Sequence, residues 1–111
     1  MNASGGVGAS TDAGSSRPTN EAIALVLDGC LYALLGGPAS SAFRMYIKRQ
    51  SSVTIADLID DPPKFHQCLE GVFGDSTPII EEFMVKRLVR EFGLSPSLCV
   101  DMVSTLSALR P

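Results

Sequence analysis

Apolar side chains recur with helical spacing along most of this chain. In residues 20–35 they stand three and four positions apart, which places them along one face of an α-helix. This face consists of Ile23, Val26, Leu27, Cys30, Leu31 and Leu34. Thr19 or Asn20 can cap the start of this helix, and Gly36 with Gly37 ends it, because glycine accepts the left-handed conformation that follows a helix. The pattern predicts a first amphipathic helix.

The same spacing continues to the end of the chain. Further helices are predicted at residues 38–50, 62–73, 78–92 and 96–109, with a short helical turn at 54–59. Ser95 is predicted to cap the last helix, whose apolar face runs from Leu98 to Leu109. No segment alternates between apolar and polar residues for long enough to predict a sheet. We therefore expect an all-α fold, a compact bundle of five to six short helices.

The segment 78–92 is apolar around more than half of its circumference. Only Glu82, Lys86 and Arg90 form a plainly polar stripe, and Glu82 precedes Lys86 by four residues, the favourable order for an ion pair on a helix. A helix of this kind lies at the centre of its domain or is covered by another subunit.

Residues 1–19 differ from the rest of the chain, because they are rich in Gly, Ser, Ala and Thr and poor in large apolar groups. Such a segment buries too little apolar surface to offset the entropy lost on ordering. The expected organisation is a disordered N-terminal tail over 1–19, followed by a single helical domain over 20–111.

The bulk composition narrows the function classes. The chain has 111 residues, of which 45% are hydrophobic, and a formal net charge of −3. A basic excess typical of nucleic-acid binders is missing. No run approaches the roughly 20 apolar residues of a membrane span, and the start does not resemble a secretory signal. We expect a cytoplasmic protein without a membrane partner, whose three cysteines are buried free thiols.

Candidate catalytic chemistry is sparse. His66 is the single histidine, and Cys68, two residues on, points to a different face of the predicted helix. Glu70 lies four residues after His66 and is placed to pair with it. The cysteine spacing does not match a zinc site. The sequence therefore predicts no catalytic, cofactor or metal site, and we expect a protein that is not an enzyme.

Two surfaces are candidates for binding a partner. Leu25 and Tyr32 lie seven residues apart, opposite the core face of the first helix and beside Asp28. Exposed apolar groups next to charge can mark a protein-interaction site; in the alternative, the last helix folds back and covers them.

The second surface is basic, formed by Arg44 and Lys48 of one helix with Lys86 and Arg90 of another. Together they can face phosphates, although a solvated charged face is the simpler interpretation, because acidic neighbours on residues 78–92 dilute the positive charge. A third hypothesis is homodimerisation through the apolar excess of residues 78–92.

Several short motifs in residues 24–94 carry a family resemblance. They are 31–37 (Leu-Tyr-Ala-Leu-Leu-Gly-Gly), 61–65 (Asp-Pro-Pro-Lys-Phe) with Leu69, 72–74 (Val-Phe-Gly), 79–81 (Ile-Ile-Glu) and 92–94 (Phe-Gly-Leu). As a set they resemble the Nitrosopumilus output domain, a small archaeal family. The resemblance implies an all-α output or interaction module with no known catalytic residues to carry over. The leading hypothesis is a non-enzymatic protein-interaction module in archaeal signalling or regulation, with a nucleic-acid-associated regulator and a homodimerisation module as alternatives.

Overall fold

The computed structural model describes residues 18–109, which form six α-helices, two short 3₁₀ helices and no strand. The α-helices are α1 (Asn20–Leu35), α2 (Gly37–Ser51), α3 (Ile55–Leu58), α4 (Pro62–Phe73), α5 (Thr77–Phe92) and α6 (Met102–Ala108). The 3₁₀ helices are η2 (Gly74–Ser76) and η3 (Pro96–Leu98). The predicted all-α bundle is confirmed. The predicted tail lies outside the described residues except for its last two positions, of which Thr19 caps α1.

The helix starts follow from side chains that accept backbone N–H groups. Thr19 Oγ1 accepts from the Ala22 N–H at 3.1 Å, and Asp61 Oδ1 accepts from the Lys64 N–H at 3.4 Å. Thr54 and Asp57 form a reciprocal capping box at the start of α3. Gly36 separates α1 from α2 with a φ of 95°, a conformation that strongly favours glycine. The predicted start of the first helix at Thr19, its end at Gly36 and the predicted helix over residues 62–73 are confirmed.

The predicted last helix is wrong at its start. Instead of one helix from Ser95, the chain forms η3, then an irregular segment, and α6 begins at Met102. Asp101 Oδ1 accepts from the Ser104 N–H at 2.7 Å, and Ser104 Oγ accepts from the Asp101 N–H at 3.1 Å. This capping box satisfies backbone groups that a continuous helix would use differently. Leu98, expected in the core, is therefore 68% exposed.

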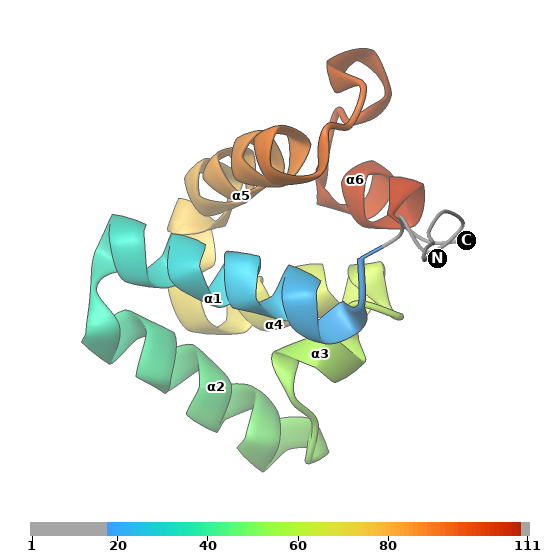
Figure 1. Cartoon of the computed structure of the whole chain (residues 1–111). Helices are drawn as coiled ribbons and strands as arrows, with labels where there is room; N and C mark the ends of the chain where they lie inside the picture. Colours follow the sequence, from blue (N-terminus) through green and yellow to red (C-terminus); the bar gives the residue numbers. More distant parts are fainter. Residues whose placement is uncertain (1–17, 110–111) are drawn as a thin grey trace, which may run out of the picture.

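Helix α1 occupies the middle of the bundle. Figure 1 shows α1 between α2 and α5, and α1 packs against both of them and against α3. Helix α6 packs against α4 and α5 and buries Met102 and Leu106, and Leu109 directly after it is buried too. One continuous apolar core draws residues from all six α-helices. The last helix thus closes this core, and Leu25 and Tyr32 remain exposed.

Aromatic rings join α2 to α4 inside this core. The Phe43 ring meets the Phe65 ring edge-on, with centroids 5.7 Å apart, and stacks with the Phe73 ring at 6.1 Å. Both geometries are favourable for aromatic pairs. Phe43 thus anchors α2 on α4, while Met45 and Lys48 of α2 stay exposed.

Candidate functional site

A groove of about 670 Å³ runs between α1 and α2 and reaches α3 at one end. Four residues of α1 line it at spacings of three and four, namely Glu21, Ala24, Leu25 and Asp28. Five residues of α2 line it, of which four share this spacing, namely Ser41, Arg44, Met45 and Lys48, and the fifth is the buried Ile47. This spacing aligns each set along one side of its helix. The groove therefore has two matching helical walls.

The groove is apolar at its floor and along its rim. Ile47 and Ile55 line it and are buried, whereas Leu25 is 74% exposed and Met45 is 57% exposed. Single exposed apolar residues are common on protein surfaces, but here two of them line one groove from its two helical walls. These residues are therefore candidates for contact with another apolar surface.

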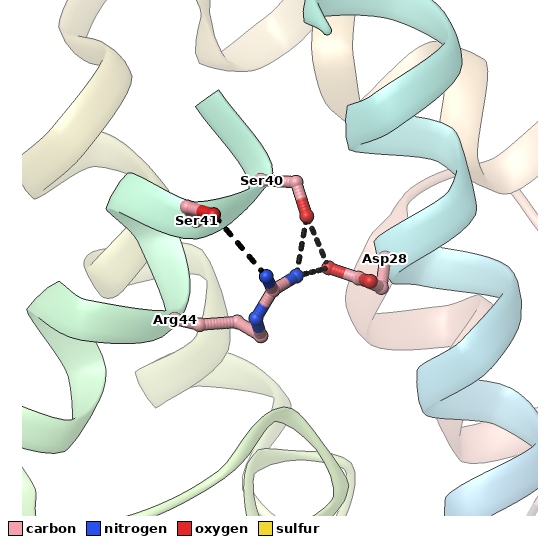
Figure 2. A network of polar contacts seen from close by, with 4 residues as sticks. All are labelled: Asp28, Ser40, Ser41 and Arg44. Atoms are coloured by element: carbon pink, nitrogen blue, oxygen red, sulfur yellow. Dashed lines mark hydrogen bonds and ion pairs between the residues drawn. The ribbon is translucent and has the colours of Figure 1, made fainter. Parts of the chain in front are cut away.

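A network of polar contacts fixes the two walls to each other (Figure 2). Arg44 Nη1 of α2 lies 2.6 Å from Asp28 Oδ1 of α1, and the same nitrogen donates to Ser40 Oγ at 2.5 Å. The Ser40 hydroxyl donates to Asp28 Oδ1 at 2.6 Å, and Arg44 Nη2 donates to Ser41 Oγ at 3.3 Å. Ser40 is only 2% exposed, so its hydroxyl needs these partners. The network holds α1 and α2 at a fixed separation.

The charges of the groove are divided between its walls. Helix α1 carries Glu21 and Asp28 and no Lys or Arg, whereas α2 carries Arg44, Lys48 and Arg49 and no Asp or Glu. Asp28 and Arg44 form an ion pair across the groove. Glu21 and Lys48 are exposed and form no ion pair within residues 18–109. Each wall thus keeps a charged group available for another molecule.

The predicted interaction residues separate into two places. Leu25 and Asp28 both line the groove, but Tyr32 does not. Tyr32 is 65% exposed near the turn between α1 and α2, where its ring lies 3.3 Å from the position that a Cβ on Gly37 would take. Met45 was not predicted as part of a binding surface, because a single methionine on an otherwise polar face of α2 has no distinctive pattern.

The four predicted nucleic-acid residues do not form one patch. Arg44 and Lys48 line the groove, while Lys86 and Arg90 belong to α5, and Figure 1 shows α1 lying between α2 and α5. Lys86 Nζ also lies 3.2 Å from Glu82 Oε2, the predicted pairing on that helix. Two of the four cations are therefore already paired with carboxylates inside the molecule.

His66 links α4 to α5. Its Nε2 lies 3.4 Å from Glu70 Oε2, as the spacing predicted, and its Nδ1 lies 2.7 Å from Glu81 Oε2 of α5. The hydrogen bond with Glu81 is the largest cause of the raised pKa of His66. Glu81 was missed because it lies 15 residues away in sequence. Both ring nitrogens of His66 are thus occupied by carboxylates.

The thiols do not resemble nucleophiles. Cys30, Cys68 and Cys99 are free and buried, as predicted. Burial raises the pKa of the Cys30 thiol to about 11, and burial also raises the pKa of Cys68. A thiolate is the reactive form of cysteine, and these shifts disfavour it.

Within residues 18–109, no three His, Cys, Asp or Glu side chains gather in a way that could hold a metal ion. Over the same residues, no helix combines the length and apolar character required to cross a bilayer.

Comparison with protein-family models, curated proteins and solved structures gives no match to this chain. The resemblance to the Nitrosopumilus output domain family therefore stays a prediction. The candidate site is defined by its own geometry alone.

Proposed function

We propose that this protein is a non-enzymatic protein-interaction module whose contact surface is the groove between α1 and α2. The observation that carries the proposal is the exposure of Leu25 and Met45 on facing walls, above the buried Ile47 and Ile55. The partner that fits is a helical surface with a central row of aliphatic side chains. It carries basic groups on the side that meets α1 and acidic groups on the side that meets α2.

Apolar burial and a preformed binding surface both favour such a contact. Fully burying an exposed aliphatic side chain contributes about 1.5–3 kcal/mol, so Leu25 and Met45 supply a useful anchor. The network around Asp28, Ser40 and Arg44 already holds the two walls in place. A preformed site loses less conformational entropy on binding than one that must be assembled.

The setting of the interaction is proposed from the sequence. The resemblance of residues 24–94 to an archaeal output domain supports a role at the output of a signalling or regulatory protein. In that role the groove transmits a signal by holding a second protein, and the buried thiols and the doubly engaged His66 take no part in chemistry.

Site-specific photo-crosslinking in the native host tests the proposal. A photoreactive amino acid replaces Leu25 in one variant and Ile79, an exposed apolar residue of α5, in the control. We expect covalent adducts with a defined protein from position 25 and not from position 79. No adduct above the control level would refute the groove as the contact surface.

The nucleic-acid alternative remains a prediction that no observation on the structure favours. It requires Lys48 and Arg90 to act without the support of Arg44 and Lys86, both of which are paired with carboxylates. Binding to duplex DNA that weakens steeply as salt rises is the behaviour that this alternative needs.

A further inference from the structure

We infer that the partner bound in the groove is a second copy of this chain, related to the first by a two-fold axis that runs along the groove. This inference rests on the groove being the contact surface, as proposed above. It adds the identity of the partner and the orientation in which the two molecules meet.

The argument begins with what a two-fold interface demands. The same patch faces itself, so the patch must be complementary to its own rotated image. The groove meets this condition in its apolar part, because Leu25 and Met45 of one copy can pack on those of the other. Its charges then decide which rotation is allowed.

Only one of the two rotations in the plane of the groove matches opposite charges. An axis along the groove places α1 of one copy over α2 of the other, so that acidic helices meet basic helices twice. An axis across the groove places α1 over α1 and α2 over α2. Acids then face acids and bases face bases, which is unfavourable. The division of charge between α1 and α2 therefore selects the axis along the groove.

The levels of the residues along the groove agree with this arrangement. The ion pair between Asp28 and Arg44 marks one level common to both walls. A helix rises about 1.5 Å per residue, so positions along the groove follow from residue numbers. Measured along the groove from the ion pair toward α3, Lys48 lies at about 6 Å and Glu21 at about 10 Å. Rotation about an axis along the groove leaves each residue at the same position along that axis. The long side chain of lysine spans the remaining distance of about 4 Å between the positions of Lys48 and Glu21. Glu21 of each copy therefore meets Lys48 of the other.

The same levels bring the apolar residues together. Leu25 lies about 4.5 Å from the level of the ion pair and Met45 about 1.5 Å, on the same side. Each Leu25 thus packs near the Met45 of the other copy at the centre, and the Glu21–Lys48 contacts flank this centre. An apolar centre with charged pairs at its edge is the usual anatomy of a protein interface.

The other occupant within the chain is excluded by composition. Residues 1–17 offer only Met1 and Val7 as sizeable apolar side chains, too few to fill an apolar groove.

Sedimentation equilibrium of the full chain tests the inference through charge reversal. We expect the natural protein to dimerise, and Glu21→Lys or Lys48→Glu alone to weaken the dimer roughly tenfold or more, because each change turns two contacts repulsive. An equimolar mixture of the two variants restores the dimer, since all four groups then meet opposite charges. The double variant restores it as well. Glu91→Lys and Arg90→Glu, the same charge changes on α5, serve as controls that leave the dimer unchanged.

Three outcomes overturn the inference. They are a monomeric natural protein at every concentration, a dimer insensitive to both reversals, and variants that stay monomeric when mixed. Thermal unfolding of each variant verifies that it folds. If the protein is monomeric while position 25 still crosslinks to a different protein, the proposed function stands and only the second copy is wrong. If position 25 crosslinks to nothing, both fail.

Discussion

The α4–α5–α6 group and the α1–α2–α3 group each begin with two longer helices that follow one another along the chain, and they differ in the third helix. Helix α6 packs against both α4 and α5 and buries Met102 and Leu106. Helix α3 has four residues, a length of about 6 Å, and reaches only one end of the groove. Helix α6 thus covers apolar surface of both α4 and α5, although Ile79 near the start of α5 stays exposed, whereas no third helix covers Leu25 and Met45.

This difference shows where the molecule has room for a further helical layer. The missing cover over α1 and α2 is not a failure of core formation, because Ile23, Leu27 and Ile47 of these helices are fully buried. The uncovered stripe lies beside the core stripe on the same helices. A second molecule on the groove would supply the layer that α6 supplies in the other group.

The largest effect on stability is expected when a leucine is replaced by alanine in each of the two groups of helices. Leu106→Ala in α6 should lower the free energy of unfolding by about 2–5 kcal/mol, because it leaves a cavity in the core. Leu25→Ala should change it by less than about 0.5 kcal/mol, because the side chain is mostly exposed. Urea unfolding followed by circular dichroism, at a protein concentration low enough to dissociate a dimer, measures both.

The expected difference between the two groups of helices is wrong if Leu106→Ala and Leu25→Ala lower the free energy of unfolding by similar amounts. That result would mean that Leu25 is buried within a single chain, and the groove would lose its central apolar residue. Leu27→Ala, two residues away on the core face of α1, provides a matched control with a large expected loss.

A smaller effect is expected at the start of α6. Asp101→Ala should lower the free energy of unfolding by about 1 kcal/mol, because it removes an N-cap acceptor. Ser95→Ala should have almost no effect, since the Ser95 side chain makes no capping hydrogen bond. Equal effects of the two substitutions in thermal unfolding would restore the single helix from Ser95 that the sequence suggested.

The sequence predicts most of this fold because most of its boundaries are local. Thr19, Thr54 and Asp61 cap helices within three residues of themselves, and such contacts can be read without knowing the tertiary structure. The start of α6 was missed for a local reason as well. Apolar spacing across residues 98–109 suggested one helix, but the Asp101–Ser104 capping box starts it later.

The candidate site was predictable only in part, because it depends on the packing of one helix on another. The apolar character of Leu25 and the charge of Asp28 are visible in the sequence. Their position opposite Met45 and Arg44 follows from the angle at which α1 packs on α2. The same limit applies to Glu81, whose contact with His66 depends on the packing of α4 against α5.

The smallest expected effect concerns the contact between His66 of α4 and Glu81 of α5. The pKa of His66 is raised above its ordinary value of 6.5, first by the hydrogen bond with Glu81 and also by the charges of Glu81 and Glu70. Because the fold favours the protonated ring, this contribution to stability is complete below pH 6.5 and is lost as the pH rises through the folded-state pKa. The His66 side chain is 40% exposed, so solvent screening limits the effect to less than about 1 kcal/mol.

Comparison of the natural protein with Glu81→Gln measures how much of this pH dependence comes from the contact between His66 and Glu81. The natural protein should lose stability relative to the variant as the pH rises from below 6.5 to well above the raised pKa. Urea unfolding at the two pH values measures the difference, and Glu82→Gln, one residue along α5, is the matched control. Glu70 also raises the pKa of His66, so some pH dependence should survive in the Glu81→Gln variant. If the difference is the same at both pH values, the His66–Glu81 contact does not persist in solution, and α4 and α5 are held together by apolar packing alone.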